Sequence, residues 1–395
     1  MTRITLDEIT PESALTIPTP LNVVIIHLTV DFGRDGGDDV DTAPQNIHPE
    51  GYNPALDSIR GIAVLFVILM HAEYYFFDAK LTWFPGGFLG VDLFFVLSGF
   101  LITHILLGSI KRRGRLNYKS FYLNRILRLF PALLLLLVIY YSYTLIGNQV
   151  QTLDLDSIFA LIFYYFNWFV ISTLRTPEGL GHMWSLAVEE QFYLLWPVLL
   201  AVLLKFMTQA RFLVASLLII ITAIAVWRAY LWHIDTNWLF VYIRTDTRID
   251  SILTGGFLAY LLSRNLLNIP NIRILSPVAA SILLLSVLSF NRESPFLYMG
   301  GFTLIAILAS VLIFHAVDQG GERELYFDWA ILRWLGKISY GLYLWHMPIF
   351  SLVSTRSEIE SSLWQATIAF ISLIILTLLS WYLVERPFLR LKVRL

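Results

Sequence analysis

The sequence predicts an all-α fold, a polytopic membrane helix bundle of about ten transmembrane helices. Of the 395 residues, 57% are hydrophobic and only 14% are charged, against roughly 45–50% and 25% in soluble domains. The apolar residues are grouped in separate runs, and a run of roughly 20 apolar residues crosses a hydrocarbon core as a helix. Aromatic residues make up 15% of the chain, an excess that suits rings placed at the two membrane interfaces.

Ten apolar runs define the expected spans. They cover residues 61–77, 88–107, 130–147, 191–208, 212–232, 251–263, 277–290, 297–317, 338–355 and 364–384. An eleventh candidate, residues 157–172, has aromatic and polar residues from Phe163 to Trp168 at its centre, which is more typical of the interface than of the bilayer centre. We therefore expect this segment to be interfacial or re-entrant on the outer side, with an eleventh span as the alternative.

The basic residues predict the orientation of the bundle. Cytoplasmic loops carry more Lys and Arg than outer loops, and with ten spans and an inner N-terminus the region from Lys111 to Arg128 and the end of the chain face the cytoplasm. The outer loops then keep only Lys80, Arg175, Arg228, Arg244, Arg248, Arg292 and Arg356. Both termini are therefore expected in the cytoplasm.

Three regions follow from this pattern. Residues 1–55 are polar and contain Gly, Asp and several prolines, so we expect a mostly disordered cytoplasmic extension. Its apolar stretch, Leu21 to Val30, is too short to span and is either a strand or a docking segment, and no cleaved signal peptide is visible. Residues 56–388 form the transmembrane domain, and residues 389–395 form a basic cytoplasmic tail.

Composition excludes several kinds of function. The chain has no Cys, which excludes disulfides, zinc thiolates and thiol nucleophiles. Its net charge of −1 argues against a nucleic-acid partner. The acidic residues near Asp38 lack the spacing of a calcium loop, and we expect no metal site. The function must then be sought in polar residues within the spans, where ionisable groups are costly and usually face an interior site.

The first such group is Arg60 and His71, which lie eleven positions apart. This is close to three helical turns, with a rise of roughly 16 Å, so both side chains share one helix face. A neutral imidazole suits a general base near neutral pH, and an arginine suits a phosphate or carboxylate. For an isolated pair, a snorkelling Arg and a hydrogen-bonded structural His would be the simpler interpretation.

The second group is Arg125 and Arg128, which lie three apart on one helical face just before Pro131. Both guanidinium groups could clamp a polyphosphate donor at the membrane surface. The preceding charges from Lys111 to Arg115 are better explained by topology and attraction to anionic lipid.

The third group is Glu189 and Glu190, two adjacent carboxylates that open a span. Adjacent helical residues point about 100° apart, so at most one is expected to aim into a shared site. Such a carboxylate could orient His71 or bind the hydroxyl of an acceptor. The alternative is an interfacial pair near a helix N-terminus, where negative charge is favoured.

Together and in this order, these segments resemble the acyltransferase-3 family of bacterial membrane O-acyltransferases. The matching stretches are LDSIRG with His71, GVDLFFVLSGFLI from Gly90, the Arg125/Arg128 segment, HMWSLAVEEQFYLLWP from His182, SYGLYLWHMP from Ser339 and ERP from Glu385. The resemblance covers roughly residues 52–390. Ser58 and Ile59 stand where the family usually has Gly and Leu, which leaves the chemistry untouched.

The resemblance implies transfer of an acyl group, with acetyl expected, from cytoplasmic acyl-CoA to a hydroxyl of an extracytoplasmic carbohydrate or glycolipid. It also implies a bacterial-type cytoplasmic (inner) membrane, and acyl-CoA as a co-substrate with no bound cofactor. Arg60 and His71 match an Arg-x10-His pair considered essential in the family, and Arg125 with Arg128 matches an element linked to acyl-CoA. Many relatives carry a fused extracytoplasmic hydrolase-like domain. Here ten residues follow Glu385, so we expect the membrane domain to perform the acceptor chemistry alone or with a partner.

The mechanism expected from these residues places the donor phosphates near Arg60, Arg125 and Arg128. His71 acts as the base, and a carboxylate of the Glu189/Glu190 pair orients it or the acceptor. An alternative mechanism passes the acyl group through a covalent intermediate on Ser98 or His71. Residues expected to contact the acceptor or support the site are Asp57, Ser98, Trp184, Ser185 and His346, and the lesser histidine candidates are His182, His233 and His315.

Two rival interpretations remain open at this point. A transporter of lipid-linked sugar or an acyl metabolite could use His71 and Glu189/Glu190 as a proton relay, and an inactive relative could act as a scaffold. The segment Arg244 to Asp250 resembles a family feature and could contact the acceptor, with a solvated salt-bridge network as the alternative. Neither the acceptor nor the oligomeric state follows from the sequence.

Overall fold

The computed structural model describes residues 53–77, 83–146, 154–234, 237–318, 329–356 and 361–391, and within these ranges the regular structure is entirely helical. The all-α prediction is therefore confirmed. Residues 1–52 of the predicted extension, including Leu21 to Val30, lie outside the described residues, as do residues 392–395 of the predicted tail.

Every apolar run predicted as a span forms a helix. Eight segments are long and apolar enough to cross a membrane, namely α1 (Pro54–Phe76), α2 (Gly90–Arg113) with its short preceding turn, α3 (Tyr118–Ile146), α6 (Met183–Phe206), α7 (Ala210–Ile234), α10 (Ile272–Ser289), α11 (Phe302–Asp318) with a preceding π-helical turn, and α14 (Ser362–Ser380) continued into α15 (Arg386–Arg390). The other two predicted spans form α9 (Thr245–Ser263) and α13 (Ser339–Arg356). Together these helices make an integral membrane protein.

The candidate eleventh span, residues 157–172, is not one continuous helix. It forms two eight-residue helices, α4 (Leu155–Ile162) and α5 (Phe166–Thr173). Between them Tyr164 has a φ of 54°, a left-handed conformation that interrupts a right-handed helix. Each helix is far shorter than the roughly 20 residues needed to span, which fits the interfacial or re-entrant prediction.

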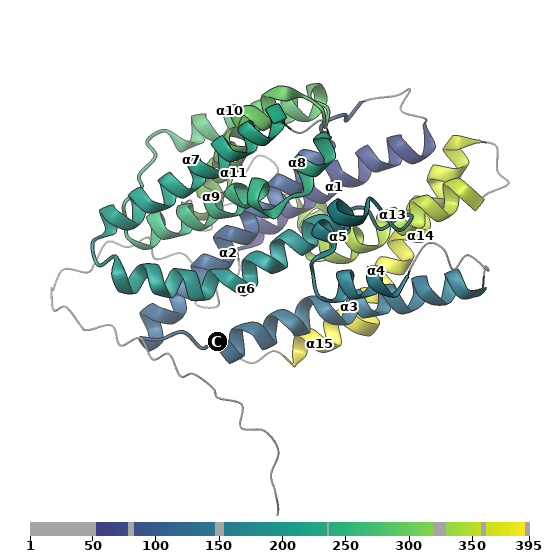
Figure 1. Ribbon diagram of the computed structural model, residues 1–395, viewed down its shortest axis with the longest axis horizontal. Coiled ribbons are helices and arrows are strands. Elements are labelled where there is room, and N and C mark those ends of the chain that lie inside the picture. Colours follow the sequence, from purple (N-terminus) through teal and green to yellow (C-terminus); the bar gives the residue numbers. More distant parts are fainter. Residues whose placement is uncertain are drawn as a thin grey trace, which may run out of the picture.

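The helices lie side by side along the long axis of the molecule, with α1 and α2 near its centre (Figure 1). Helices α7, α9, α10 and α11 form one side of this arrangement, and α3 lies with α14 and α15 on the other. Helix α1 begins at Pro54, two residues before the predicted domain boundary, because Asn53 caps it by accepting a hydrogen bond from the Ala55 amide at 2.9 Å. The short helix α12 (Ala330–Lys337) packs closely on α1.

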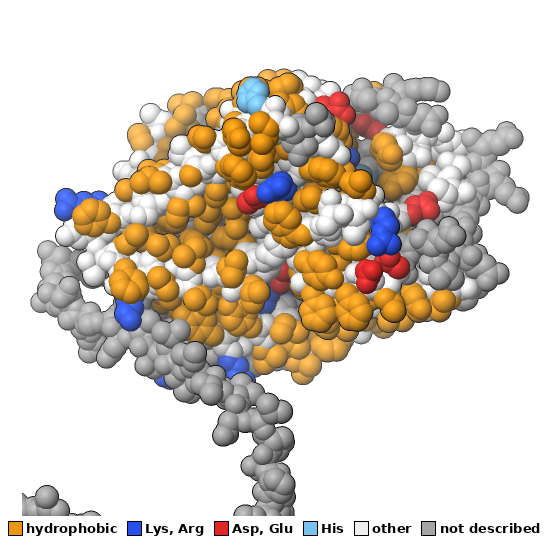
Figure 2. Space-filling view, in the orientation of Figure 1, with side chains coloured by type: hydrophobic (Ala, Val, Ile, Leu, Met, Phe, Trp, Pro, Cys, Tyr) orange, Lys and Arg blue, Asp and Glu red, His pale blue; other side chains and the backbone are white. Residues whose placement is uncertain are grey.

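The surface of the bundle is largely apolar. Figure 2 shows hydrophobic side chains over most of the visible face, with charged groups scattered among them. Large apolar side chains are exposed on α7, such as Ile219 at 67%, and on the last span, such as Leu383 at 70%. An apolar surface this extensive would favour aggregation in water and suits contact with membrane lipid.

Small residues allow α2 and α9 to approach each other closely. A Cβ atom at Gly99 would overlap the backbone carbonyl of Ile252, and one at Gly255 would overlap that of Val96. Small residues at such crossings are a general device of membrane helix packing. Ser98 is adjacent to Gly99, so the crossing also fixes the position of a candidate site residue.

Replacing Gly99 by alanine is expected to destabilise the bundle by about 1–3 kcal/mol, because the added methyl group forces the two helices apart. Thermal unfolding of the purified protein in detergent measures this effect. Gly108→Ala in the same helix is the matched control, since its Cβ atom meets only the flexible end of Arg112. Equal melting temperatures for the two variants would contradict the tight crossing.

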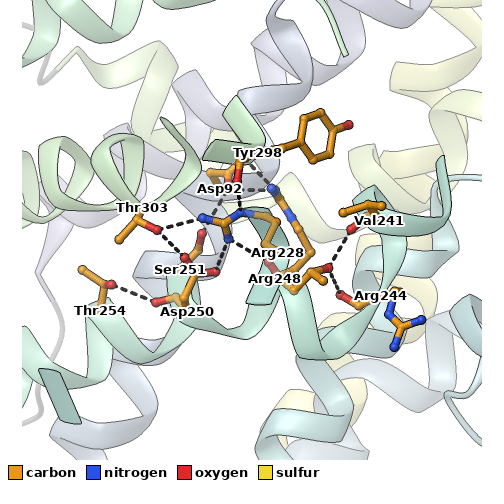
Figure 3. Close-up of polar contacts among 11 residues, drawn as sticks. Asp92, Arg228, Val241, Arg244, Arg248, Asp250, Ser251, Thr254, Tyr298 and Thr303 are labelled. Atoms are coloured by element: carbon orange, nitrogen blue, oxygen red, sulfur yellow. Dashed lines mark hydrogen bonds and ion pairs between the residues drawn. The ribbon is translucent and has the colours of Figure 1, made fainter. Parts of the chain in front are cut away.

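Two fully buried ion pairs join three helices beside this crossing, and a hydrogen bond links them to a fourth (Figure 3). Arg248 of α9 donates to both carboxylate oxygens of Asp92 of α2, at 2.8 and 2.9 Å. Arg228 of α7 donates to Asp250 of α9 at 2.8 Å and to Thr303 of α11 at 2.8 Å. All four charged side chains are 0% exposed.

This network corrects two predictions. Arg228 and Arg248 were counted with the outer loops, but both lie within helices with buried side chains. The solvated salt-bridge alternative for 244–250 holds only for the partly exposed pair Arg244–Asp246, because Arg248 and Asp250 are buried. Charges that meet opposite charges inside a bundle escape the cost of facing lipid alone, which is why apolar runs tolerate them.

Candidate active site

A cavity of about 160 Å³ lies among α1, α2, α3, α6 and α13. Its wall follows α2 from Val91 to Ile105, a distance of roughly 20 Å at the helical rise. The cavity is therefore elongated along the bundle. Its polar lining comes from residues far apart in the sequence, namely Arg60, Ser98, Arg125, Arg128, Ser185, Glu189, Tyr193, Ser339, Tyr340 and Tyr343.

Three guanidinium groups, those of Arg60, Arg125 and Arg128, line the cavity. Arg60 forms an ion pair with the buried Asp57 at 2.9 Å. Arg125 lies 3.5 Å from the centre of the Tyr193 ring and 3.5 Å from a carboxylate oxygen of Glu190. Arg128, among the residues described, pairs with no carboxylate. The wall thus carries positive charge that an anionic ligand could neutralise.

The two adjacent glutamates have different surroundings. Glu189 lines the cavity and accepts hydrogen bonds from the Ser98 hydroxyl at 3.0 Å and from the Tyr193 hydroxyl at 3.5 Å. Glu190 does not line the cavity and faces Arg125 instead. This divergence is what adjacent helical positions produce. Neither carboxylate contacts His71 in the described part of the chain, so the structure does not support the expectation that one of them orients the imidazole.

Tyr343 separates the cavity from a cluster of histidines. Its hydroxyl donates to the backbone carbonyl of His182 at 3.0 Å and lies 2.5 Å from the hydroxyl of Ser185. Its own backbone carbonyl lies 2.6 Å from Nδ1 of His346. Tyr343 and Ser185 line the cavity on one side, and the histidines lie directly behind them.

His71 of α1 contacts His346 of α13. Nε2 of His346 lies 3.3 Å from Nδ1 of His71, and the two ring centres are 5.0 Å apart. His182 is the third member of the cluster, with its ring centre 4.8 Å from that of His346. His182 and His346 are buried. His71 itself does not line the cavity, which ends at Tyr343.

The hydrogen-bond partners assign the tautomer of His71. Nδ1 lies 2.8 Å from the carbonyl oxygen of Val67, which can only accept, so Nδ1 carries the proton. Nε2 lies 3.2 Å from Nη2 of Arg292, which can only donate, so Nε2 carries a lone pair. His71 is therefore neutral, with its basic nitrogen directed toward Arg292.

His346 is placed to support this tautomer. Its Nδ1 donates to the carbonyl oxygen of Tyr343, which leaves the lone pair on Nε2 facing the Nδ1 proton of His71. When His71 takes up a proton at Nε2, the positive charge spreads to Nδ1, where His346 and Val67 accept. A second group that orients the base is a common feature of catalytic sites.

The other predicted residues lie outside the cavity and the histidine cluster. Trp184 is buried, with its ring centre 4.8 Å from that of Tyr242 and 6.0 Å from that of Phe95. His233 is exposed on α7 and His315 is buried in α11, and neither lines the cavity. Within the described residues, no three His, Asp or Glu side chains are placed to hold a metal ion.

Sequence reasoning missed two members of the site. Tyr343 appears in the quoted SYGLYLWHMP stretch but was not singled out, and Arg292 was counted only as an outer-loop charge. A tyrosine in an aromatic-rich span gives no signal of its own. Arg292 could have been noticed as one of the few basic residues predicted on the outer side.

Comparisons with known proteins identify the family of this chain. The acyltransferase-3 family model, described as an acyltransferase domain, matches residues 53–386. The chain is 35% identical over 353 residues to peptidoglycan O-acetyltransferase OatA of Listeria monocytogenes, covering 85% of this chain and 56% of that protein. It is 35% identical over 356 residues to the putative peptidoglycan O-acetyltransferase YrhL of Bacillus subtilis, covering 85% and 55%.

A putative O-acetyltransferase of Staphylococcus aureus is 35% identical over 319 residues, which cover 76% of this chain and 51% of that protein. The chain thus spans about half the length of these curated relatives. No solved structure matches it. Because the family model matches most of the chain, including the helices that carry Arg60, His71, Arg125 and Arg128, this protein belongs to the acyltransferase-3 family of membrane acyltransferases.

Proposed function

We propose that this chain transfers an acyl group, in the first instance acetyl, from cytoplasmic acyl-CoA to a hydroxyl of an extracytoplasmic glycan. The observation that carries the proposal is the elongated cavity with Arg60, Arg125 and Arg128 in its wall and the neutral His71 behind Tyr343. A peptidoglycan fragment is the first acceptor to test, since two of the relatives are named for O-acetylation of peptidoglycan.

The donor binds with its phosphates at the guanidinium groups and its acyl end along α2. Arg128 has no carboxylate partner among the described residues, so a phosphate there would form a charge-assisted contact without breaking an ion pair. A cytoplasmic donor site agrees with the positive-inside orientation, in which the start of α3 faces the cytoplasm. The thioester then lies near Ser185 and Tyr343, at the boundary with the histidines.

The reaction is an acyl transfer between a thiol and an alcohol. Nε2 of His71 takes the proton of the acceptor hydroxyl while the oxygen attacks the thioester carbonyl. The bond from carbon to sulfur breaks, and the leaving CoA thiolate takes up the proton held by His71, which returns the imidazole to its neutral form. His346 stabilises the imidazolium of His71 at Nδ1 while it holds the proton.

The test is release of CoA thiol from acetyl-CoA by the purified protein in lipid bilayer discs, with and without a soluble peptidoglycan fragment. Acetyl transferred to the fragment is measured by mass spectrometry. Thiol release that matches acetylated product supports the proposal. Movement of acceptor or acyl metabolite across a vesicle membrane without thiol release would instead favour the transporter interpretation, for which the family membership gives no support.

Arg128→Ala is expected to raise the KM for acetyl-CoA by about tenfold to a hundredfold, because a hydrogen bond to an ionised partner contributes about 1.5–3 kcal/mol. Thiol release as a function of acetyl-CoA concentration measures this. Arg211→Ala is the matched control, since Arg211 is an exposed arginine at the start of α7 outside the cavity. An unchanged KM in Arg128→Ala would remove Arg128 from the donor site.

A further inference from the structure

Arg292 reaches from the connection between α10 and α11 into the bundle and contacts the base. Its Nη2 lies 3.2 Å from Nε2 of His71 and 3.4 Å from the sulfur of Met70. The side chain is partly exposed, so it joins the surface at this end of the bundle to the centre of the proposed chemistry. His71 lies roughly 16 Å along α1 from Arg60, so Arg292 approaches from the end opposite the donor phosphates.

The connection that carries Arg292 is well ordered by local hydrogen bonds. The Asn291 side chain accepts from the Glu293 amide at 3.1 Å and from the Ser294 hydroxyl at 3.0 Å. The Arg292 carbonyl accepts from the Tyr298 hydroxyl at 2.6 Å. These contacts hold the backbone, so a displacement of the guanidinium would require rotation of the Arg292 side chain itself.

The partners of Arg292 are weak for a guanidinium. Among the described residues it makes no ion pair, and its polar contacts are an imidazole nitrogen and a thioether sulfur. The carboxylate of Glu73, on the same end of α1, accepts from the backbone amides of Trp83 and Phe84 at 3.0 and 3.1 Å. A guanidinium placed this way is available to a carboxylate or phosphate, which it binds in bidentate fashion.

The same contact blocks the base. A guanidinium donates and cannot accept a proton, and it occupies the one lone pair through which His71 could take the proton of a hydroxyl. Proton transfer requires the hydroxyl to lie about 2.6–3.2 Å from that nitrogen. Arg292 must therefore leave Nε2 before His71 can act.

We propose that Arg292 binds an acidic group, a carboxylate or phosphate, on the acceptor, and that this binding draws it away from His71 and frees Nε2 for the acceptor hydroxyl. The inference rests on the proposed transfer to a glycan and names the class of acceptor: a glycan with an acidic group close to the reacting hydroxyl. Arg292 is then a specificity and positioning residue, since it touches the acceptor and controls access to the base.

The test compares three acceptors that differ in one group. They are a peptidoglycan disaccharide with a free carboxylate, the same disaccharide with this carboxyl reduced to the alcohol, and the reduced form carrying a phosphate ester. The native protein is expected to show a KM about tenfold to a hundredfold lower for at least one acidic form than for the neutral form. A comparison of the two acidic acceptors distinguishes recognition of a carboxylate from recognition of a phosphate.

Arg292→Gln is expected to raise the KM for the acidic acceptors to the value for the neutral form, so that the preference for an acidic group is lost. Hydrolysis of acetyl-CoA without acceptor should increase, because the side chain no longer covers Nε2 with a fixed charge. Arg292→Lys should restore part of the acidic preference. Arg175→Gln is the matched control, since Arg175 is 58% exposed and pairs with Asp154 away from the cavity.

Equal KM values for acidic and neutral acceptors in the native protein would overturn the role of Arg292 while leaving acyl transfer intact. An equal loss of acyl transfer to all three acceptors in Arg292→Gln would also overturn this role of Arg292 and would indicate a structural role instead. Calorimetric binding of the three disaccharides to the protein in bilayer discs tests the site without turnover. Preferential binding of an acidic form that Arg292→Gln abolishes would support the site even if no thioester were cleaved, and equal binding would reject it.

Discussion

His71→Ala is expected to lower acyl transfer from acetyl-CoA by about a hundredfold to ten-thousandfold, the range that a positioned general base contributes. The imidazole is held by three contacts, to Val67, His346 and Arg292, which fix the position and the tautomer of the ring. The measurement is kcat for CoA thiol release with a saturating acceptor, using protein in lipid bilayer discs.

His233→Ala is the matched control for this experiment. His233 is exposed on α7 and does not line the cavity, so its loss should leave kcat within about twofold. The melting temperature of each variant separates loss of chemistry from loss of fold. A folded His71→Ala protein with native kcat would exclude His71 as the base and direct attention to the Ser98–Glu189 pair in the cavity.

A further variant separates the base from its support. If His346 only orients His71, His346→Ala should retain more activity than His71→Ala, because Val67 still accepts from Nδ1.

The helices could be predicted from the sequence because each apolar run reports its own length and hydropathy. The same local reasoning placed Arg60 and His71 on one face of α1, and it predicted that Glu189 and Glu190 would diverge. These are relations within one helix, where the geometry of the backbone fixes the outcome. They needed no knowledge of how the helices pack.

Relations between helices could not be predicted in this way. His346 lies 275 positions from His71 and Arg292 lies 221 positions from it, and nothing in either segment indicates that they converge. The buried charges are a second example of contacts between helices that local sequence does not predict. Arg248 and Asp92 lie 156 positions apart, so the sequence shows two charges near apolar runs and does not show that they neutralise each other.

Asp92→Ala is expected to destabilise the bundle by about 3–5 kcal/mol, because it leaves the charge of Arg248 buried without its partner. Arg248 is 0% exposed, its Nη2 donates to both oxygens of Asp92, and its Nε and Nη1 have no hydrogen-bond partner in the described chain. The stacked Phe302 ring, 3.7 Å from the guanidinium carbon, cannot replace a carboxylate. Thermal and denaturant unfolding in detergent measure the loss.

Two comparisons make this prediction specific to the buried pair. Asp246→Ala removes the carboxylate of a partly exposed pair with Arg244 and should cost no more than about 1 kcal/mol. Replacing Asp92 by alanine together with Arg248 by methionine, which keeps much of the arginine's buried volume, should be less destabilising than Asp92→Ala alone, because no isolated charge is left buried. The loss of unfolding free energy in the double variant could instead equal the sum of the losses in the two single variants. The two side chains would then stabilise the fold independently. Their role would then be packing of the crossing between α2 and α9, and not neutralisation of charge.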